Sequence, residues 1–252
     1  LLPMLYSDRC PELMTFLYPM LGAAFFYLSG QAALFQTLRW TEASRASPML
    51  GLKILFLAVI TTTVMGESLS GLRWAAVCMC VLAAFVLYYS GGSIPWQAVA
   101  MLLFCCLGYS LSDLSIGLLV ERLQAMGSLR GAAFGVCATY VVTGLTGAAL
   151  LPLVGRGRLG VRSWGEAVPV AVAWFLAMVC LYVSFRLIGV VPGNIVQSTR
   201  GIISILLGGL IARRGLTHLE SKIGAGVLWR RLAAAALMSL AIGLFLAEAL
   251  WK

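Results

Sequence analysis

The segment Ala43–Met65, ASRASPMLGLKILFLAVITTTVM, places Lys53 near the middle of an apolar run long enough to cross a bilayer. A second run, Pro192–Ala212, PGNIVQSTRGIISILLGGLIA, places Arg200 at a similar position. An ion in hydrocarbon is costly, so a cation at this depth usually faces a cavity lined by protein and has a function there. The two runs therefore predict membrane-spanning helices with a functional centre.

Composition favours a membrane protein over a soluble one. Of the 252 residues, 61% are hydrophobic and 11% are charged, whereas a soluble domain carries about 25% charged residues. The net charge of +9 comes from short basic clusters at the ends of apolar runs. That pattern is typical of loops at a membrane surface, with the bilayer as partner, and it does not indicate binding to nucleic acid.

The cysteines do not indicate a metal site or a disulfide framework. Six of the seven lie inside apolar runs, and the chain has no CxxC motif and one histidine, His218. A buried cysteine behaves as a small apolar residue. We therefore expect no metal and no cofactor.

Apolar runs of about 20 residues predict the spans. Such segments are expected to be helices, because backbone groups in lipid must be satisfied within the segment. The expected fold is an all-α, polytopic transmembrane helix bundle of about eight spans: Met14–Leu38, Ala43–Met65, Leu72–Tyr89, Ile94–Val120, Gly131–Val154, Glu166–Arg186, Pro192–Ala212 and Leu232–Leu250.

An internal repeat relates the two halves of the chain. Leu2–Phe26 aligns with Leu151–Phe175 without a gap, and after a short skip Lys53 aligns with Arg200. Residues 1–91 are thus predicted to hold the last three helices of a five-helix repeat, and residues 92–252 all five. We therefore expect that about two helices precede Leu1. An odd number of helices inverts the second copy, which places a transport site at the midplane between the repeats.

Three local features carry a resemblance to a known family. Ala33–Arg39, ALFQTLR, is similar to a helix end before a tight turn, Pro48 lies near the start of the next span, and Glu67 matches an acidic residue that closes it. With the two five-helix repeats, the chain resembles the EamA-like branch of the drug/metabolite transporter superfamily. It departs from that pattern at Arg213–Gly215, where the second acid would stand, and at Arg200. The resemblance implies ten helices in the full protein and transport of small metabolites, without identifying the substrate.

Polar residues around the two cations are the candidate substrate-binding residues. Around Arg200, polar and small residues recur at spacings of three and four, which places them on one helix face: Asn194, Gln197, Gly201, Ser204 and Gly208. This stripe suits the wall of a solvated cavity, and the alternative is helix–helix contact through small residues. For Lys53 the alternative to a cavity is snorkelling toward the headgroups.

Asp113 is the acid placed well inside a span. Tyr109 and Ser110 lie one turn before it. Asp113 is predicted to be the counter-ion of Lys53 or Arg200 or a group that couples protons to transport, and a structural ion pair is the alternative. Tyr109 and Gln31 complete the substrate-binding candidates, although Gln31 and its neighbour Tyr27 also suit an ordinary bundle core.

These features favour a secondary transporter working by alternating access, with an anionic or zwitterionic substrate. An integral-membrane lipid-modifying enzyme and a non-transporting scaffold are the rival classes, and the scarcity of histidines and acids argues against the enzyme. The expected location is the bacterial inner membrane. Orientation stays open, because the basic residues favour one topology and the family resemblance the other.

Overall fold

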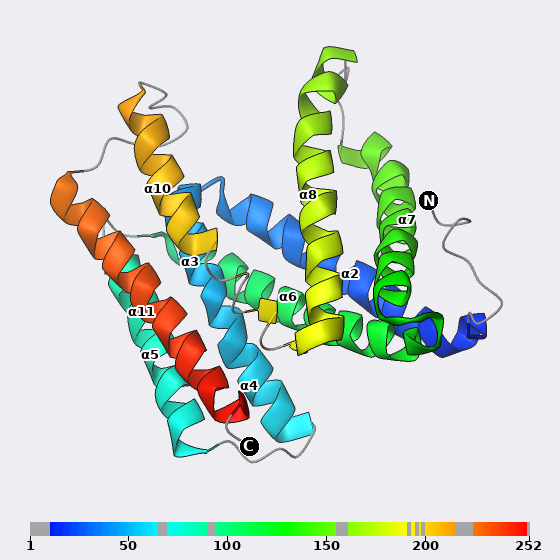
Figure 1. Cartoon of the computed structure of the whole chain (residues 1–252). Coiled ribbons are helices and arrows are strands. Elements are labelled where there is room, and N and C mark those ends of the chain that lie inside the picture. The colour runs from blue at the N-terminus through cyan, green and yellow to red at the C-terminus, as the bar shows by residue number, and fades with distance from the viewer. Residues whose placement is uncertain are drawn as a thin grey trace. The chain divides into compact units, whose positions relative to one another are not determined.

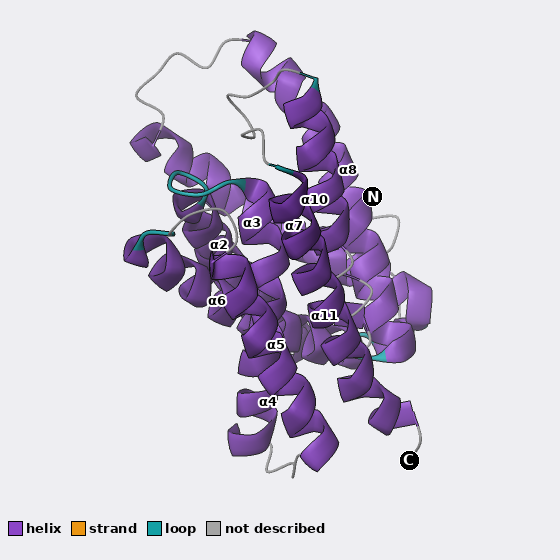
Figure 2. Cartoon of the chain, turned by 90° about the vertical axis from the view of Figure 1, so that its left-hand side faces the viewer, coloured by secondary structure: helices purple, strands orange, loops and turns teal. Residues whose placement is uncertain are grey.

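A computed structural model describes residues 11–64, 70–89, 94–154, 161–190, 193–194, 197, 200–214 and 224–250. All regular structure in these ranges is helical (Figure 2). The elements are α2 (Leu13–Thr37), α3 (Ala43–Met49), η1 (Leu50–Leu52), α4 (Lys53–Val64), α5 (Gly71–Tyr89), α6 (Trp96–Arg122), η2 (Gln124–Met126), α7 (Ser128–Val154), α8 (Val161–Ile188), α10 (Arg200–Arg213) and α11 (Ala225–Leu250).

Four of these helices, α2, α6, α7 and α8, are long and apolar enough to cross a membrane. Their exposed side chains include large apolar ones, such as Phe25 on α2 and Val170 on α8, which are 67% and 69% exposed. A water-soluble protein rarely presents so much apolar surface. These long apolar helices and their exposed apolar side chains indicate an integral membrane protein with an apolar surface toward lipid.

The segment that begins at Ala43 forms three consecutive helical elements instead of one uniform helix. Between α3 and α4 lies η1, a 3₁₀ turn, and the flanking residues Met49 and Lys53 both keep right-handed helical angles. The chain is thus helical from Ala43 to Val64 with a change of hydrogen-bond register at Gly51. Such a change inside a helix often marks a hinge. Met65, the predicted end of this span, lies outside the described residues.

The chain divides into two compact units, Leu1–Leu28 with Ser112–Gly193 and Ser29–Leu111 with Asn194–Lys252. We call them the first and second units, and the boundary falls inside α2 and α6. In the first unit α7 packs along α8 (Figure 1). Its core includes Phe16 and Phe134, whose rings meet edge to face at 5.9 Å between centroids.

In the second unit, helices pack closely in two pairs. In it α5 lies along α11, and α3 lies against α10 (Figure 1). The buried residues of α5 and α11 include several alanines, Ala76, Ala83, Ala234, Ala235 and Ala241. Small side chains let helix backbones approach closely, which is the usual mode of helix association in membranes.

Within the second unit, α2 and α6 approach closely at Gly30. A Cβ atom at this position would lie 2.8 Å from Cδ1 of Tyr109 and 3.3 Å from the carbonyl oxygen of Cys105. Since the carbonyl belongs to the backbone of α6, it cannot move aside without shifting the helix. The absence of a side chain at Gly30 therefore sets the distance between the two helices.

We predict that Gly30→Ala destabilises the protein by about 1–3 kcal/mol, because overpacking a tight contact forces the backbone apart. Lower thermal stability in detergent would show this. The matched control is Gly144→Ala on α7, where an added Cβ meets nothing within 4 Å and alanine favours the helix. Equal melting temperatures for both variants would contradict the close approach.

Candidate functional site

Lys53 lies inside the protein and contacts a residue of the opposite predicted repeat. It is 5% exposed at the start of α4, and its ammonium group donates a hydrogen bond to the side-chain oxygen of Gln197. Both residues belong to the second unit. Because the side chain is enclosed by protein, its burial argues against the snorkelling alternative.

Ser110 on α6 supports the backbone at Lys53. Its hydroxyl lies 2.8 Å from the carbonyl oxygen of Lys53 and 2.8 Å from that of Cys106. A hydroxyl carries a single proton, so the two carbonyls share one donor. The thiol of Cys106 lies 3.9 Å from the carbonyl oxygen of Met49. Side chains of α6 therefore contact the carbonyl groups on both sides of the 3₁₀ turn.

Two further candidates, Tyr109 and Gln31, contact each other. The hydroxyl of Tyr109 donates to the side-chain oxygen of Gln31 over 2.5 Å, and Tyr109 is 7% exposed. The pair joins the second-unit part of α2 to α6 beside Gly30. This contact suits the packing interpretation of Gln31 and leaves a substrate role for either residue as a prediction.

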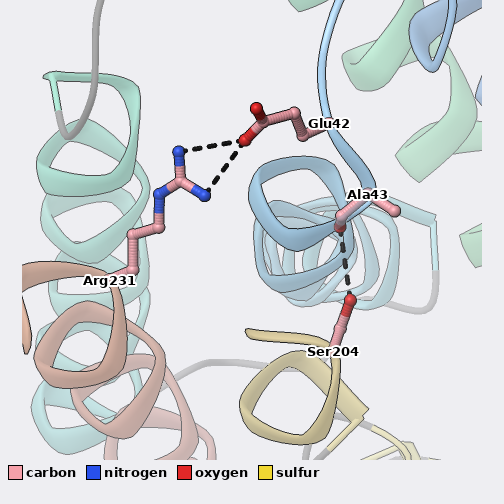
Figure 3. A network of polar contacts seen from close by, with 4 residues as sticks. All are labelled: Glu42, Ala43, Ser204 and Arg231. Atoms are coloured by element: carbon pink, nitrogen blue, oxygen red, sulfur yellow. Dashed lines mark hydrogen bonds and ion pairs between the residues drawn. The ribbon is translucent and has the colours of Figure 1, made fainter. Parts of the chain in front are cut away.

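The stripe around Arg200 has more than one environment. Asn194 is fully buried, whereas the hydroxyl of Ser204 donates to the carbonyl oxygen of Ala43 over 3.4 Å (Figure 3). Ser204 thus joins α10 to the first residue of α3, which is a helix–helix contact. Arg200 begins α10, but its side chain lies outside the described part of the chain, so the cavity role of Arg200 stays a prediction.

Asp113 belongs to the first unit. It is 5% exposed on α6. Tyr182 of α8, 1% exposed, interacts with the carboxylate charge of Asp113 and with the side chain of Thr139 on α7. Asp113, Tyr182 and Thr139 thus come from three different helices of the first unit. Its predicted pairing with Lys53 or Arg200 stays a prediction.

An ion pair between Arg231 and Glu42 was not predicted from the sequence. Both terminal nitrogens of Arg231 lie 3.2 Å from one carboxylate oxygen of Glu42 (Figure 3). The side chains are 2% and 25% exposed. The last span was expected to begin at Leu232, which leaves Arg231 outside it, but α11 begins at Ala225. Glu42, directly before α3, stands where acidic residues favour a helix start, and that was the available signal.

No known protein-family model and no curated protein sequence matches this chain. The resemblance to the EamA-like transporters therefore stays a prediction. Within the described part of the chain, no three His, Cys, Asp or Glu side chains gather as metal ligands would.

We predict that Arg231→Ala lowers the stability of the protein by about 3 kcal/mol, because removing one partner of a buried pair leaves the other charge uncompensated. The neighbouring variant Arg230→Ala is the control, since Arg230 is exposed. Thermal unfolding of both variants in the same detergent measures the difference. A drop of equal size in both would mean that the ion pair does not hold α11 to the start of α3.

Proposed function

We propose that the protein is a secondary transporter of small metabolites that works by alternating access on an anionic or zwitterionic substrate. The observation that carries the proposal is the buried ammonium group of Lys53, held by Gln197. A cation enclosed in the apolar part of a membrane protein is a functional-site candidate by default.

The chemistry of the Lys53–Gln197 contact suits a carboxylate. Gln197 uses its amide oxygen to accept from Lys53, and its amide nitrogen carries two further N–H donors. An ammonium group beside an amide can thus offer charge and directed hydrogen bonds to one carboxylate. Charge-assisted hydrogen bonds of this kind are the strong ones.

The packing of the second unit supports an inverted repeat. The alignment that pairs Lys53 with Arg200 also pairs α5 with the first part of α11, and these two helices pack along each other. Where a pseudo-twofold axis relates two copies of a repeat, equivalent helices are expected to pack against each other. In this interpretation α3–α4, α5, α10 and α11 contribute the remaining spans, which gives eight present of ten in an EamA-like arrangement.

The 3₁₀ turn at Leu50–Leu52 gives the proposed transporter a place to bend. It directly precedes Lys53, so bending there would move the ammonium group. Transport requires that substrate binding differ between the inward and outward states. Asp113, as a buried carboxyl, is the proposed proton-coupling residue, and the bacterial inner membrane is the proposed location.

The test is flux through proteoliposomes containing the full-length gene product, with ¹⁴C-labelled amino acids, monocarboxylates and dicarboxylates as probes. We expect Lys53→Met to lower flux of the transported probe more than tenfold, because the loss of one charge-assisted hydrogen bond is worth about 2 kcal/mol. Gln197→Leu should lower it in the same direction.

Arg214→Ala is the matched control, because Arg214 is an exposed cation at the end of α10, and it should keep normal flux. Flux that survives Lys53→Met in a folded protein would refute the site but keep the transporter. Absence of flux for every probe in the unmodified protein would refute the transporter and favour the enzyme or scaffold class.

A further inference from the structure

Two exposed Arg–Trp pairs stand at the ends of apolar segments in the second unit. Arg39 and Trp40 follow α2, which is one of the four candidate spans. Trp229 and Arg230 lie in the second turn of α11, just before the apolar run that begins at Leu232. All four side chains are exposed, and the two tryptophans are 41% and 71% exposed.

The ion pair between Arg231 and Glu42 brings the two Arg–Trp pairs near each other. Arg231 directly follows Arg230, and Glu42 is two residues after Trp40. Both terminal nitrogens of Arg231 lie 3.2 Å from one carboxylate oxygen of Glu42 (Figure 3). Consecutive Cα atoms are about 3.8 Å apart, so both pairs lie within a few residues of this contact. Two segments 189 positions apart in the sequence thus share one end of the second unit.

The charge exposed beside this contact is positive. Glu42 accepts both terminal nitrogens of Arg231, so these two charges compensate each other. Arg39 donates to the amide oxygen of Gln36 over 3.2 Å, which leaves its positive charge in place. Arg230 forms no hydrogen bond or ion pair with the residues that the structure describes. Two exposed guanidinium groups can therefore contact an anion.

This combination of side chains fits an anionic phospholipid. A guanidinium group binds phosphate through paired N–H donors, and basic residues next to a membrane segment attract anionic headgroups. Tryptophan rings lie at the level of the headgroups, with their apolar part toward the acyl chains. A soluble anion would use the arginines alone and would gain nothing from the exposed indoles. The tryptophans therefore favour a lipid over a free anion.

We propose that Arg39 and Arg230 bind the headgroup phosphate of an anionic phospholipid, while Trp40 and Trp229 contact its glycerol and upper acyl chains. The bound lipid bridges the end of α2 and the start of α11. This site goes beyond the proposed function and does not depend on it, because lipid binding requires neither Lys53 nor flux of a substrate.

The test is native mass spectrometry of the purified, delipidated full-length protein in detergent. The probes are dioleoylphosphatidylglycerol, which is anionic, and dioleoylphosphatidylcholine, which has the same chains and a zwitterionic headgroup. We expect phosphatidylglycerol to bind at least fivefold more tightly, because the choline cation repels the arginines. An excess of inorganic phosphate should not displace it, because phosphate has no acyl chains.

Variants assign the preference to residues. Arg39→Gln and Arg230→Gln should each weaken phosphatidylglycerol about fivefold, the usual contribution of one basic residue at a membrane surface. The double variant should weaken it about 25-fold and abolish the preference over phosphatidylcholine. Trp229→Leu should weaken both lipids. Arg122→Gln is the matched control, because Arg122 is an exposed cation at the end of α6 in the first unit, and it should leave both dissociation constants unchanged.

Four results would overturn the proposal. Equal binding of the two lipids, or an unchanged preference in the double variant, would refute the site. Equal weakening by Arg122→Gln would mean a general attraction between a basic protein and an anionic lipid. Displacement by inorganic phosphate would make a soluble anion the ligand. If Arg39→Gln unfolds the protein, Arg230→Gln decides: a fivefold loss supports the site, and an unchanged dissociation constant refutes it.

Discussion

Polar groups placed among hydrocarbon must find their partners within the protein, and this constraint organises the structure around Lys53. The ammonium group reaches Gln197, and the carbonyl of the same residue receives the hydroxyl of Ser110. Two contacts of α4, one with α6 and one with Gln197, therefore satisfy polar groups of the single residue Lys53.

Hydroxyl groups in the described helices divide into two kinds under this constraint. Thr143 and Thr146 donate to carbonyl oxygens one turn earlier in their own helix, at 2.9 Å in each case. Such local bonds satisfy the group without joining helices. In contrast, Ser112 donates to the carbonyl oxygen of Ala23 over 3.0 Å and thereby joins α6 to α2. Hydroxyls that reach another helix mark where the bundle is held together.

The sequence predicted the helical class and the places of the long spans well, because apolar length is a direct physical requirement of the bilayer. It did not predict the 3₁₀ turn at Leu50–Leu52, since the choice between two hydrogen-bond registers depends on tertiary partners such as Ser110. The start of α11 was also missed, because Arg230 and Arg231 look like loop charges until the contact with Glu42 is known.

The sequence also predicted only part of the candidate site, because contacts between helices depend on tertiary packing. Residue type and depth pointed to Lys53, Gln197 and Asp113, but their contacts depend on which helices meet. Gln31 and Tyr109 are 78 positions apart and meet because Gly30 allows α2 to approach α6.

Arg231 and Lys53 are both buried in the second unit, and their described contacts differ. Arg231 contacts a carboxylate with two nitrogens, which neutralises its charge and joins two helices. Lys53 donates to the amide oxygen of Gln197, which orients the ammonium group. An apolar side chain of similar length would fill such a position at lower energetic cost, since enclosing an ion in protein is seldom the most stable solution. In the proposed transporter Lys53 acts on the substrate, whereas Arg231 and Glu42 join two helices.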